Sequence, residues 1–168
     1  MKTEIGVSLR RTAFAATVAA CYVVLTYISS LVGLDKGFIQ IRLSEVITVL
    51  PFFTPCAIPG LFVGCIISGL LTAAALPDVI FGSLVTLAAA YLTFLAGKRK
   101  KTYIAPLPPV ILNAVFIPLI LKYVYTINIG LPILSLLILV GESVTAGIGG
   151  MLLLTKLPAS LTEQIKSI

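Results

Sequence analysis

The sequence predicts an all-α integral membrane protein, a single bundle of six transmembrane helices with both termini in the cytoplasm. Three observations lead to this fold class: an apolar composition, uncharged runs long enough to cross a bilayer, and basic residues distributed unequally among the loops. Of 168 residues, 59% are hydrophobic and only 11% are charged, whereas about a quarter of the residues of a soluble domain are charged. We therefore assign the whole chain, residues 1–168, to one transmembrane domain.

The composition also excludes several kinds of chemistry. The 12 Lys and Arg and the 6 Asp and Glu give a net charge of +6. The basic residues are scattered between long uncharged runs, so a nucleic acid is not an expected partner. The chain has no histidine, and its three cysteines are isolated from one another, so neither a metal-ligand cluster nor a nucleophile–base pair is expected. We predict a protein that is not an enzyme and that carries no metal and no cofactor.

Charged residues delimit the apolar runs, and four of these runs have roughly the 20 residues that one helical crossing needs. A fifth run, Val46–Pro77, is 32 residues long and is interrupted by Pro51, Pro55 and Pro59. Because proline ends or turns a helix, this run contains either one long crossing or a hairpin of two.

Basic residues decide between one crossing and two, because Lys and Arg concentrate in cytoplasmic loops. The pair at 10–11 precedes the first span, and a run of four basic residues occupies 98–101. Both lie in the cytoplasm only if Val46–Pro77 crosses the membrane twice. The predicted spans are therefore approximately 12–33, 44–55, 59–75, 79–97, 104–122 and 130–154.

Glu142 is the most informative polar residue within a span. It lies about 12 residues into the last span, which at ~1.5 Å per residue places it roughly 18 Å from the boundary and near the middle of the bilayer. A carboxylate at that depth costs about 2.5–3.5 kcal/mol on insertion scales, so it requires a polar cavity, a cation or a proton. We expect Glu142 to face a ligand; the alternative is an internal hydrogen bond that clamps two helices.

Four further polar residues are candidates for the same site. Asn113 lies in the middle of the fifth span, where an amide needs hydrogen-bond partners. A hydrogen bond to another helix and a contact with a ligand explain this amide equally well. Gln40, Arg42 and Glu45 gather at the outer end of the second span. An Arg42–Glu45 surface pair at a helix start is one explanation of that cluster. A binding site is the other, and it is favoured because Glu45 and Glu142 are both reachable from the outer side.

Small residues in the first span predict close packing of helices. Ala16 and Ala20 form one pair with four-residue spacing, and Ala15 and Ala19 form another. Such pairs allow a second helix to approach closely. The spacing alone does not distinguish a helix of the same chain from a helix of another protein.

The segment 39–65, which reads IQIRLSEVITVLPFFTPCAIPGLFVGC, resembles the signature of the QueT family. Members of this family are substrate-binding (S) components of energy-coupling factor (ECF) transporters assigned to queuosine precursors. The expected six spans and the alanine-rich first span agree with the resemblance along the whole chain.

The resemblance implies a division of labour between subunits. The S component would capture a 7-deazaguanine, such as 7-aminomethyl-7-deazaguanine or queuine, from outside a Gram-positive plasma membrane. It would then dock on an ECF transmembrane component and two cytoplasmic ATPases, which hydrolyse the ATP. Docking in such families uses an alanine motif on the first helix, and Ala13, Ala16 and Ala20 match that motif here.

The same resemblance gives the candidate residues chemical roles. A guanine edge offers two adjacent N–H donors that one carboxylate accepts together. We assign this edge to Glu142 and the amine of the substrate to Glu45, although the reverse is nearly as good. Asn113, Gln40 and Arg42 would meet the carbonyl and ring nitrogens. The alternative functions are an S component for another vitamin and a free-standing small membrane transporter.

Overall fold

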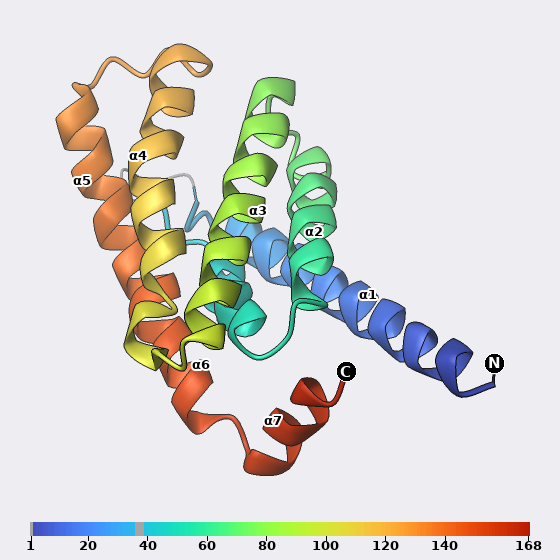
Figure 1. The fold of residues 1–168 in the computed structure, drawn as a ribbon. Helices are drawn as coiled ribbons and strands as arrows, with labels where there is room; N and C mark the ends of the chain where they lie inside the picture. The colour runs from blue at the N-terminus through green and yellow to red at the C-terminus, as the bar shows by residue number, and fades with distance from the viewer. Residues whose placement is uncertain (1, 36–38) are drawn as a thin grey trace.

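The computed structural model describes residues 2–35 and 39–168, and throughout these ranges the only regular secondary structure is helical (Figure 1). The predicted all-α class is therefore confirmed. In chain order, the elements are α1 (Lys2–Leu31), the 3-10 helix η1 (Leu43–Phe52), α2 (Ala57–Leu71), α3 (Leu76–Lys98), the 3-10 turn η2 (Thr102–Ile104), α4 (Leu107–Tyr123), α5 (Leu131–Glu142), the π-helix η3 (Ser143–Gly149), α6 (Gly150–Lys156) and α7 (Ala159–Lys166).

Four helical segments among the described residues are long and apolar enough to cross a membrane. They coincide with the first, fourth, fifth and sixth predicted spans. In the last of them, α5, η3 and α6 follow one another without a break and form one continuous rod. The four segments are Gly6–Leu31, Leu76–Lys98, Thr102–Tyr123 and Leu131–Lys156.

The predicted spans 44–55 and 59–75 correspond to η1 and α2, which are shorter. The 10 residues of η1 extend about 20 Å at the ~2.0 Å rise of a 3-10 helix. The 15 residues of α2 extend about 22 Å at ~1.5 Å per residue. Both lengths fall short of the ~30 Å hydrocarbon layer. The chain reverses between them at residues 53–56, beside Pro55 where a turn was predicted, but six full crossings and cytoplasmic termini stay predictions.

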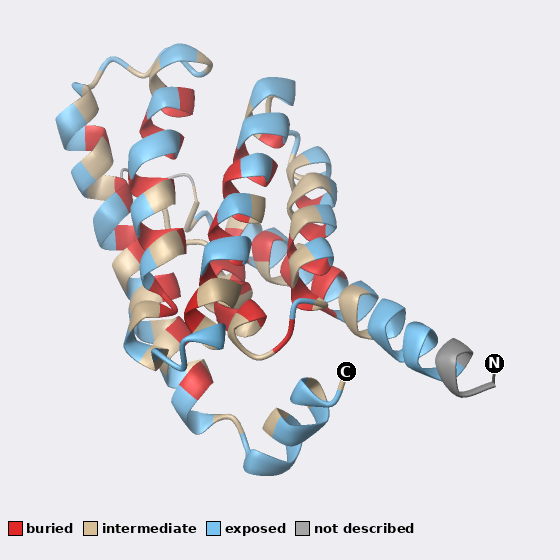
Figure 2. Cartoon of the chain, in the orientation of Figure 1, coloured by how far each residue is buried: buried red, intermediate tan, exposed pale blue. Residues whose placement is uncertain are grey.

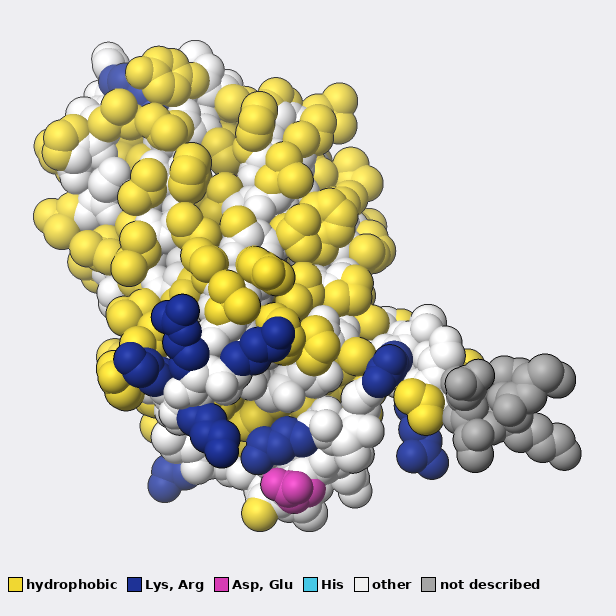
Figure 3. Space-filling model, viewed as in Figure 1, with side chains coloured by type: hydrophobic (Ala, Val, Ile, Leu, Met, Phe, Trp, Pro, Cys, Tyr) yellow, Lys and Arg dark blue, Asp and Glu magenta, His cyan; other side chains and the backbone are white. Residues whose placement is uncertain are grey.

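The surface is that of a membrane protein. Most of the exposed large side chains are aliphatic or aromatic, and they cover the upper and middle parts of the face shown in Figure 3. Lys and Arg side chains gather at the end of the molecule that carries the C-terminus (Figure 3). Lys98 at the end of α3 and Lys156 at the end of α6 belong to this basic end, which is the kind of clustering that the positive-inside rule describes.

Helices α1 and α2 approach each other at backbone contact distance through two glycines of α2. A Cβ atom on Gly64 would lie 2.8 Å from the Cβ of Tyr22 and 3.0 Å from the carbonyl oxygen of Ala19, and one on Gly60 would overlap the carbonyl of Ala15. The Ala15–Ala19 pair is thus used within the chain, one of the two explanations that the spacing allowed.

A second close approach brings the segment before η1 into the bundle. A side chain on Gly141 would overlap the backbone carbonyl of Gln40, and a Cβ on Gly149 would lie 2.8 Å from a methyl carbon of Val46. Gly141 is about 15 Å along the rod that begins at residue 131, at ~1.5 Å per residue. The segment 39–42, which is neither helix nor strand, therefore reaches about the middle of the rod, at a depth where irregular backbone is tolerated only inside protein.

The hydrophobic core is divided into small clusters that leave room for polar residues between them. One cluster joins α4 to α5, a second joins α1, α2 and α3, and a third joins η1 to α6 and to the residues after η2. Buried residues line the inner faces of the helices, whereas the outer faces are exposed (Figure 2). The buried polar and charged side chains include Thr26, Ser29, Ser44, Glu45, Thr48, Ser68, Thr86, Thr93, Asn113, Glu142 and Thr145.

Replacement of Gly64 with valine is expected to lower the free energy of unfolding by about 1–3 kcal/mol, the usual cost of overpacking a close contact. The added side chain meets Tyr22 and the backbone of α1, and backbone cannot move aside as a flexible side chain can. Thermal unfolding of the full chain in detergent measures the effect. Gly6→Val is the matched control, because a Cβ on Gly6 would have nothing within 4 Å; equal melting temperatures for the two variants would contradict this account of the α1–α2 contact.

Candidate functional site

Two carboxylates meet at one amide inside the bundle. The Nδ2 of Asn113 donates hydrogen bonds to Glu142 Oε1 at 2.9 Å and to Glu45 Oε2 at 3.4 Å. The three side chains are 2–6% exposed and come from η1, α4 and α5. Asn113 therefore links helices, which was one of its two predicted roles, and at the same time it holds two acids close together.

Glu45 is held on both of its oxygens. The hydroxyl of Tyr22 donates to Glu45 Oε1 at 2.8 Å, while Oε2 accepts from Asn113. Tyr22 is only 1% exposed and was not predicted as a site residue. Its sequence signal is a hydroxyl-bearing ring in the middle of an apolar span, but Tyr27 in the same helix carries the same signal and is exposed.

Glu142 is only half satisfied. Its Oε1 accepts from Asn113, but its Oε2 is buried and has no hydrogen-bond partner among the described residues. A buried acceptor without a partner costs free energy. The α-helix changes to the π-helix η3 directly after Glu142, and π-turns occur frequently at functional sites. The sequence reasoning did not predict this change.

The free oxygen of Glu142 belongs to a small polar cavity, here called the inner cavity, of about 10 Å³, roughly the room that one water molecule needs. All five residues predicted to bind substrate line it. The fold thus brings the five residues together, and their binding roles stay predictions. The lining residues are Gln40, Arg42, Glu45, Gly82, Thr86, Asn113, Ile117, Ile138 and Glu142.

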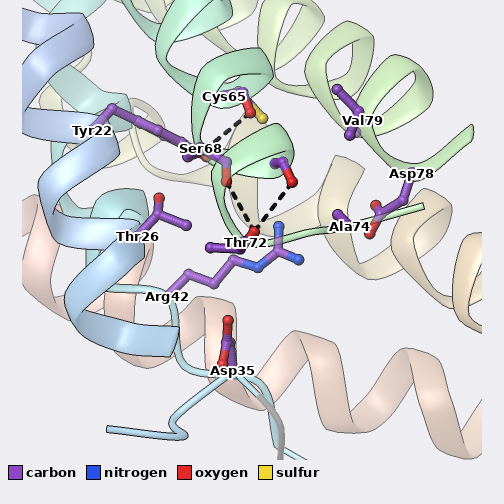
Figure 4. Close-up of a pocket in the computed structure, with 12 residues that line it drawn as sticks. Tyr22, Thr26, Asp35, Arg42, Cys65, Ser68, Thr72, Ala74, Asp78 and Val79 are labelled. Carbon is purple, nitrogen blue, oxygen red and sulfur yellow. Dashed lines mark hydrogen bonds between the residues drawn. The ribbon is translucent and has the colours of Figure 1, made fainter. Parts of the chain in front are cut away.

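The Arg42–Glu45 surface pair is absent. Lys166–Glu163 is the one ion pair formed between described residues, and Glu45 is buried and engaged with Tyr22 and Asn113. Arg42 precedes η1 in extended conformation, and its side chain lies along a second cavity (Figure 4). The cluster at the start of η1 is thus an interior arrangement and not a solvated helix cap.

The second cavity, here called the outer cavity, measures about 40 Å³ and shares Arg42 and Gly82 with the inner one. Its lining includes Asp35, shortly after the end of α1, and Asp78, in the first turn of α3. The start of α3 lies at the end of the bundle opposite the C-terminus (Figure 1), and Figure 4 shows the lining residues. Its lining residues are Tyr22, Thr26, Asp35, Arg42, Cys65, Ser68, Gly69, Thr72, Ala74, Asp78, Val79 and Gly82.

Tyr125, in the segment after α4, connects that segment to the start of α3 through two hydrogen bonds. Its hydroxyl donates to Asp78 Oδ2 at 2.7 Å and accepts from the backbone N–H of Ala75 at 3.1 Å. Partial burial raises the pKa of the Tyr125 hydroxyl above its usual value, so the hydroxyl keeps its proton and remains a donor at neutral pH. Asp78 was not among the predicted site residues.

The three alanines predicted to dock a partner lie on a free face of α1. Ala13, Ala16 and Ala20 are all exposed, whereas the neighbouring pair Ala15 and Ala19 faces α2. The two alanine pairs of this helix thus serve different faces. Docking on the exposed face stays a prediction.

Comparison with known proteins agrees with the resemblance carried by segment 39–65. A curated relative, the queuosine precursor transporter QueT of Lactococcus lactis subsp. cremoris (strain MG1363), is 42% identical over 72 residues. The aligned stretch covers 43% of this chain and 42% of that relative, so the chain matches less than half of the relative's length. No solved structure matches the chain. The sequence model described as QueT transporter matches residues 12–158, nearly the whole length, and the chain therefore belongs to the QueT transporter family.

Proposed function

We propose that this chain captures a 7-deazaguanine, a precursor of queuosine, from the outer side of the membrane and releases it through a partner module. Membership of the QueT transporter family and the name of the Lactococcus relative support the substrate class. The observation that carries the proposal concerns Glu142: this residue lines a polar cavity, and its buried Oε2 has no hydrogen-bond partner among the described residues.

The geometry favours Glu142 over Glu45 as the reader of the base edge. Both oxygens of Glu45 already accept hydrogen bonds from Tyr22 and Asn113, whereas Glu142 Oε2 accepts none from a described residue. The N1–H and the 2-amino group of a guanine edge are adjacent donors that suit one carboxylate. Arg42 and Gln40 line the same cavity and can donate to the carbonyl oxygen of the base.

Substrate binding requires the inner cavity to widen, because about 10 Å³ cannot hold a bicyclic base. Arg42 is the side chain whose displacement joins the inner and outer cavities, since it lines both. It forms no ion pair with a described residue, so its movement breaks no such bond. In this proposal, the cavity of about 10 Å³ is the contracted form of the site.

Energy for transport comes, in this proposal, from an ECF transmembrane component and two cytoplasmic ATPases. The chain has no Gly-Lys-Ser/Thr phosphate loop. Its exposed Ala13, Ala16 and Ala20 offer a face that another helix can approach closely. The basic end of the bundle would face the cytoplasm of a Gram-positive cell. In a six-span arrangement, η1 and α2 would form the second and third crossings.

Replacement of Glu142 with glutamine is expected to weaken binding of 7-aminomethyl-7-deazaguanine by at least about 2 kcal/mol, roughly thirtyfold. The variant loses a charged acceptor and turns an amide donor toward a donor edge. Isothermal titration of the purified full chain measures the effect. Glu163→Gln is the matched control, because the side chain of Glu163 is 75% exposed and paired only with Lys166. If the Glu142→Gln variant bound 7-aminomethyl-7-deazaguanine with unchanged affinity, Glu142 would not belong to the site. If the wild type bound a different vitamin instead, the chain would be an S component of another kind.

Replacement of Ala16 and Ala20 together with leucine is expected to abolish ATP-dependent uptake while leaving substrate titration unchanged. Bulky side chains prevent close approach of a partner helix, and both alanines are exposed, so the fold does not need them small. Uptake into cells that contain the partner ATPases is the measurement. Ala88→Leu, at an exposed alanine of α3, is the control. Transport by the isolated chain in liposomes, driven by an ion gradient alone, would instead support a free-standing transporter.

A further inference from the structure

The outer cavity contains polar groups that recognition of the base edge does not use. Thr26 is 7% exposed, and its Oγ1 is buried without a hydrogen-bond partner among the described residues. Oδ1 of Asp35 is in the same condition. Buried polar groups are nearly always hydrogen-bonded, so groups left without a partner at one cavity indicate a place that a polar guest completes.

Asp78 adds a charged acceptor on the opposite side of this cavity. Its one hydrogen bond through a side-chain oxygen to a described residue is the one that Oδ2 accepts from Tyr125, which leaves Oδ1 available. Figure 4 shows Thr26 and Asp78 on either side of the cavity, with Arg42 extending between them. The three acceptors come from α1, the segment after α1, and α3.

The charge of the described lining residues suits a cation. Asp35 and Asp78 carry two negative charges and Arg42 carries one positive charge, so the lining has a formal charge of −1 that one ammonium group neutralises. An ammonium has three donors and no acceptor, which matches the three available acceptor atoms. A neutral apolar group would leave these acceptors without partners.

We propose that the outer cavity is a subsite for a cationic amine on the 7-substituent of the substrate. The inference rests on the proposed function, because the base edge must lie at Glu142 in the inner cavity. Arg42 and Gly82 are common to both cavities, and Gly82 has no side chain to obstruct the passage once Arg42 moves. The amine is then bound by Asp78, Asp35 and Thr26, and Glu45 acts by positioning Asn113.

The test compares two ligands that differ in the amine alone, 7-aminomethyl-7-deazaguanine and 7-methyl-7-deazaguanine. Asp78→Asn is expected to weaken binding of the aminomethyl ligand about tenfold or more, the scale of one charge-assisted hydrogen bond, and to change binding of the methyl ligand by less than about twofold. Thr26→Val, which has the same shape without the hydroxyl, is expected to act in the same selective direction. Isothermal titration of the full chain in detergent supplies both affinities.

Tyr125→Phe separates the charge of Asp78 from its structural hydrogen bond. This variant removes the donor to Asp78 Oδ2 but keeps the carboxylate, so both ligands are expected to bind within about threefold of the wild type. The subsite would be overturned if Tyr125→Phe weakened binding of the aminomethyl ligand selectively and by as much as Asp78→Asn does. Equal losses of both ligands in Asp78→Asn, or no loss of either, would overturn it as well.

Glu142→Gln distinguishes failure of the subsite from failure of the proposed function. It is expected to weaken binding of both ligands to the same extent, because both present the same base edge. If it does so while Asp78→Asn is not selective, the subsite is wrong and the base site stands. If the wild type binds neither ligand, the proposed function fails and the subsite fails with it.

Discussion

The structure depends on the hydrogen bonds that hold two acids to one amide in the interior of a membrane bundle. Glu45, Asn113 and Glu142 come from three different elements, and hydrocarbon offers no water to satisfy them. Tyr22 adds a fourth element by donating to Glu45. The hydrophobic clusters border this polar network: Tyr22 belongs to one of them, and Ile117 and Ile138 of another line the inner cavity. Removing one partner from such a network leaves a buried acid uncompensated, which costs more than the bond itself contributes.

Glycine makes this centre possible because it lets irregular backbone enter the bundle. The carbonyl of Gln40 packs directly against Gly141, so the segment 39–42 reaches the depth of Glu142. The same segment carries Arg42 and leads into η1, which packs on the rod at Gly149 and Gly150. Backbone that is neither helix nor strand is tolerated at membrane depth only where it is enclosed in protein or lines a cavity. Here it does both, because the carbonyl of Gln40 packs on Gly141 and the side chains of Gln40 and Arg42 line the inner cavity.

The two cavities give the proposed transport function a physical order. The outer cavity lies toward the end opposite the basic residues and presents acceptors, while the inner one ends at the half-satisfied Glu142. In the proposed function, the donor edge of the substrate lies in the inner cavity and its cationic substituent lies in the outer one. Arg42 lines both cavities, so in this proposal its displacement connects them. The exposed alanines of α1, Ala13, Ala16 and Ala20, line neither cavity, so the proposed docking face and the proposed binding site are separate surfaces.

The sequence by itself determined the membrane class, the four long spans and two of the buried polar residues, Asn113 and Glu142. An acid or an amide inside an uncharged run is a local property, so Glu142 and Asn113 could be chosen without a structure. Only the tertiary structure decided how these residues pair: Tyr22 with Glu45, Asn113 between the acids, and Arg42 without an ion pair to Glu45. It also decided which alanine pair packs inside, and that η1 is a 3-10 helix and η3 a π-helix. These outcomes depend on contacts between segments distant in the chain, and the periodicity of a single segment contains no information about the neighbour that it will meet.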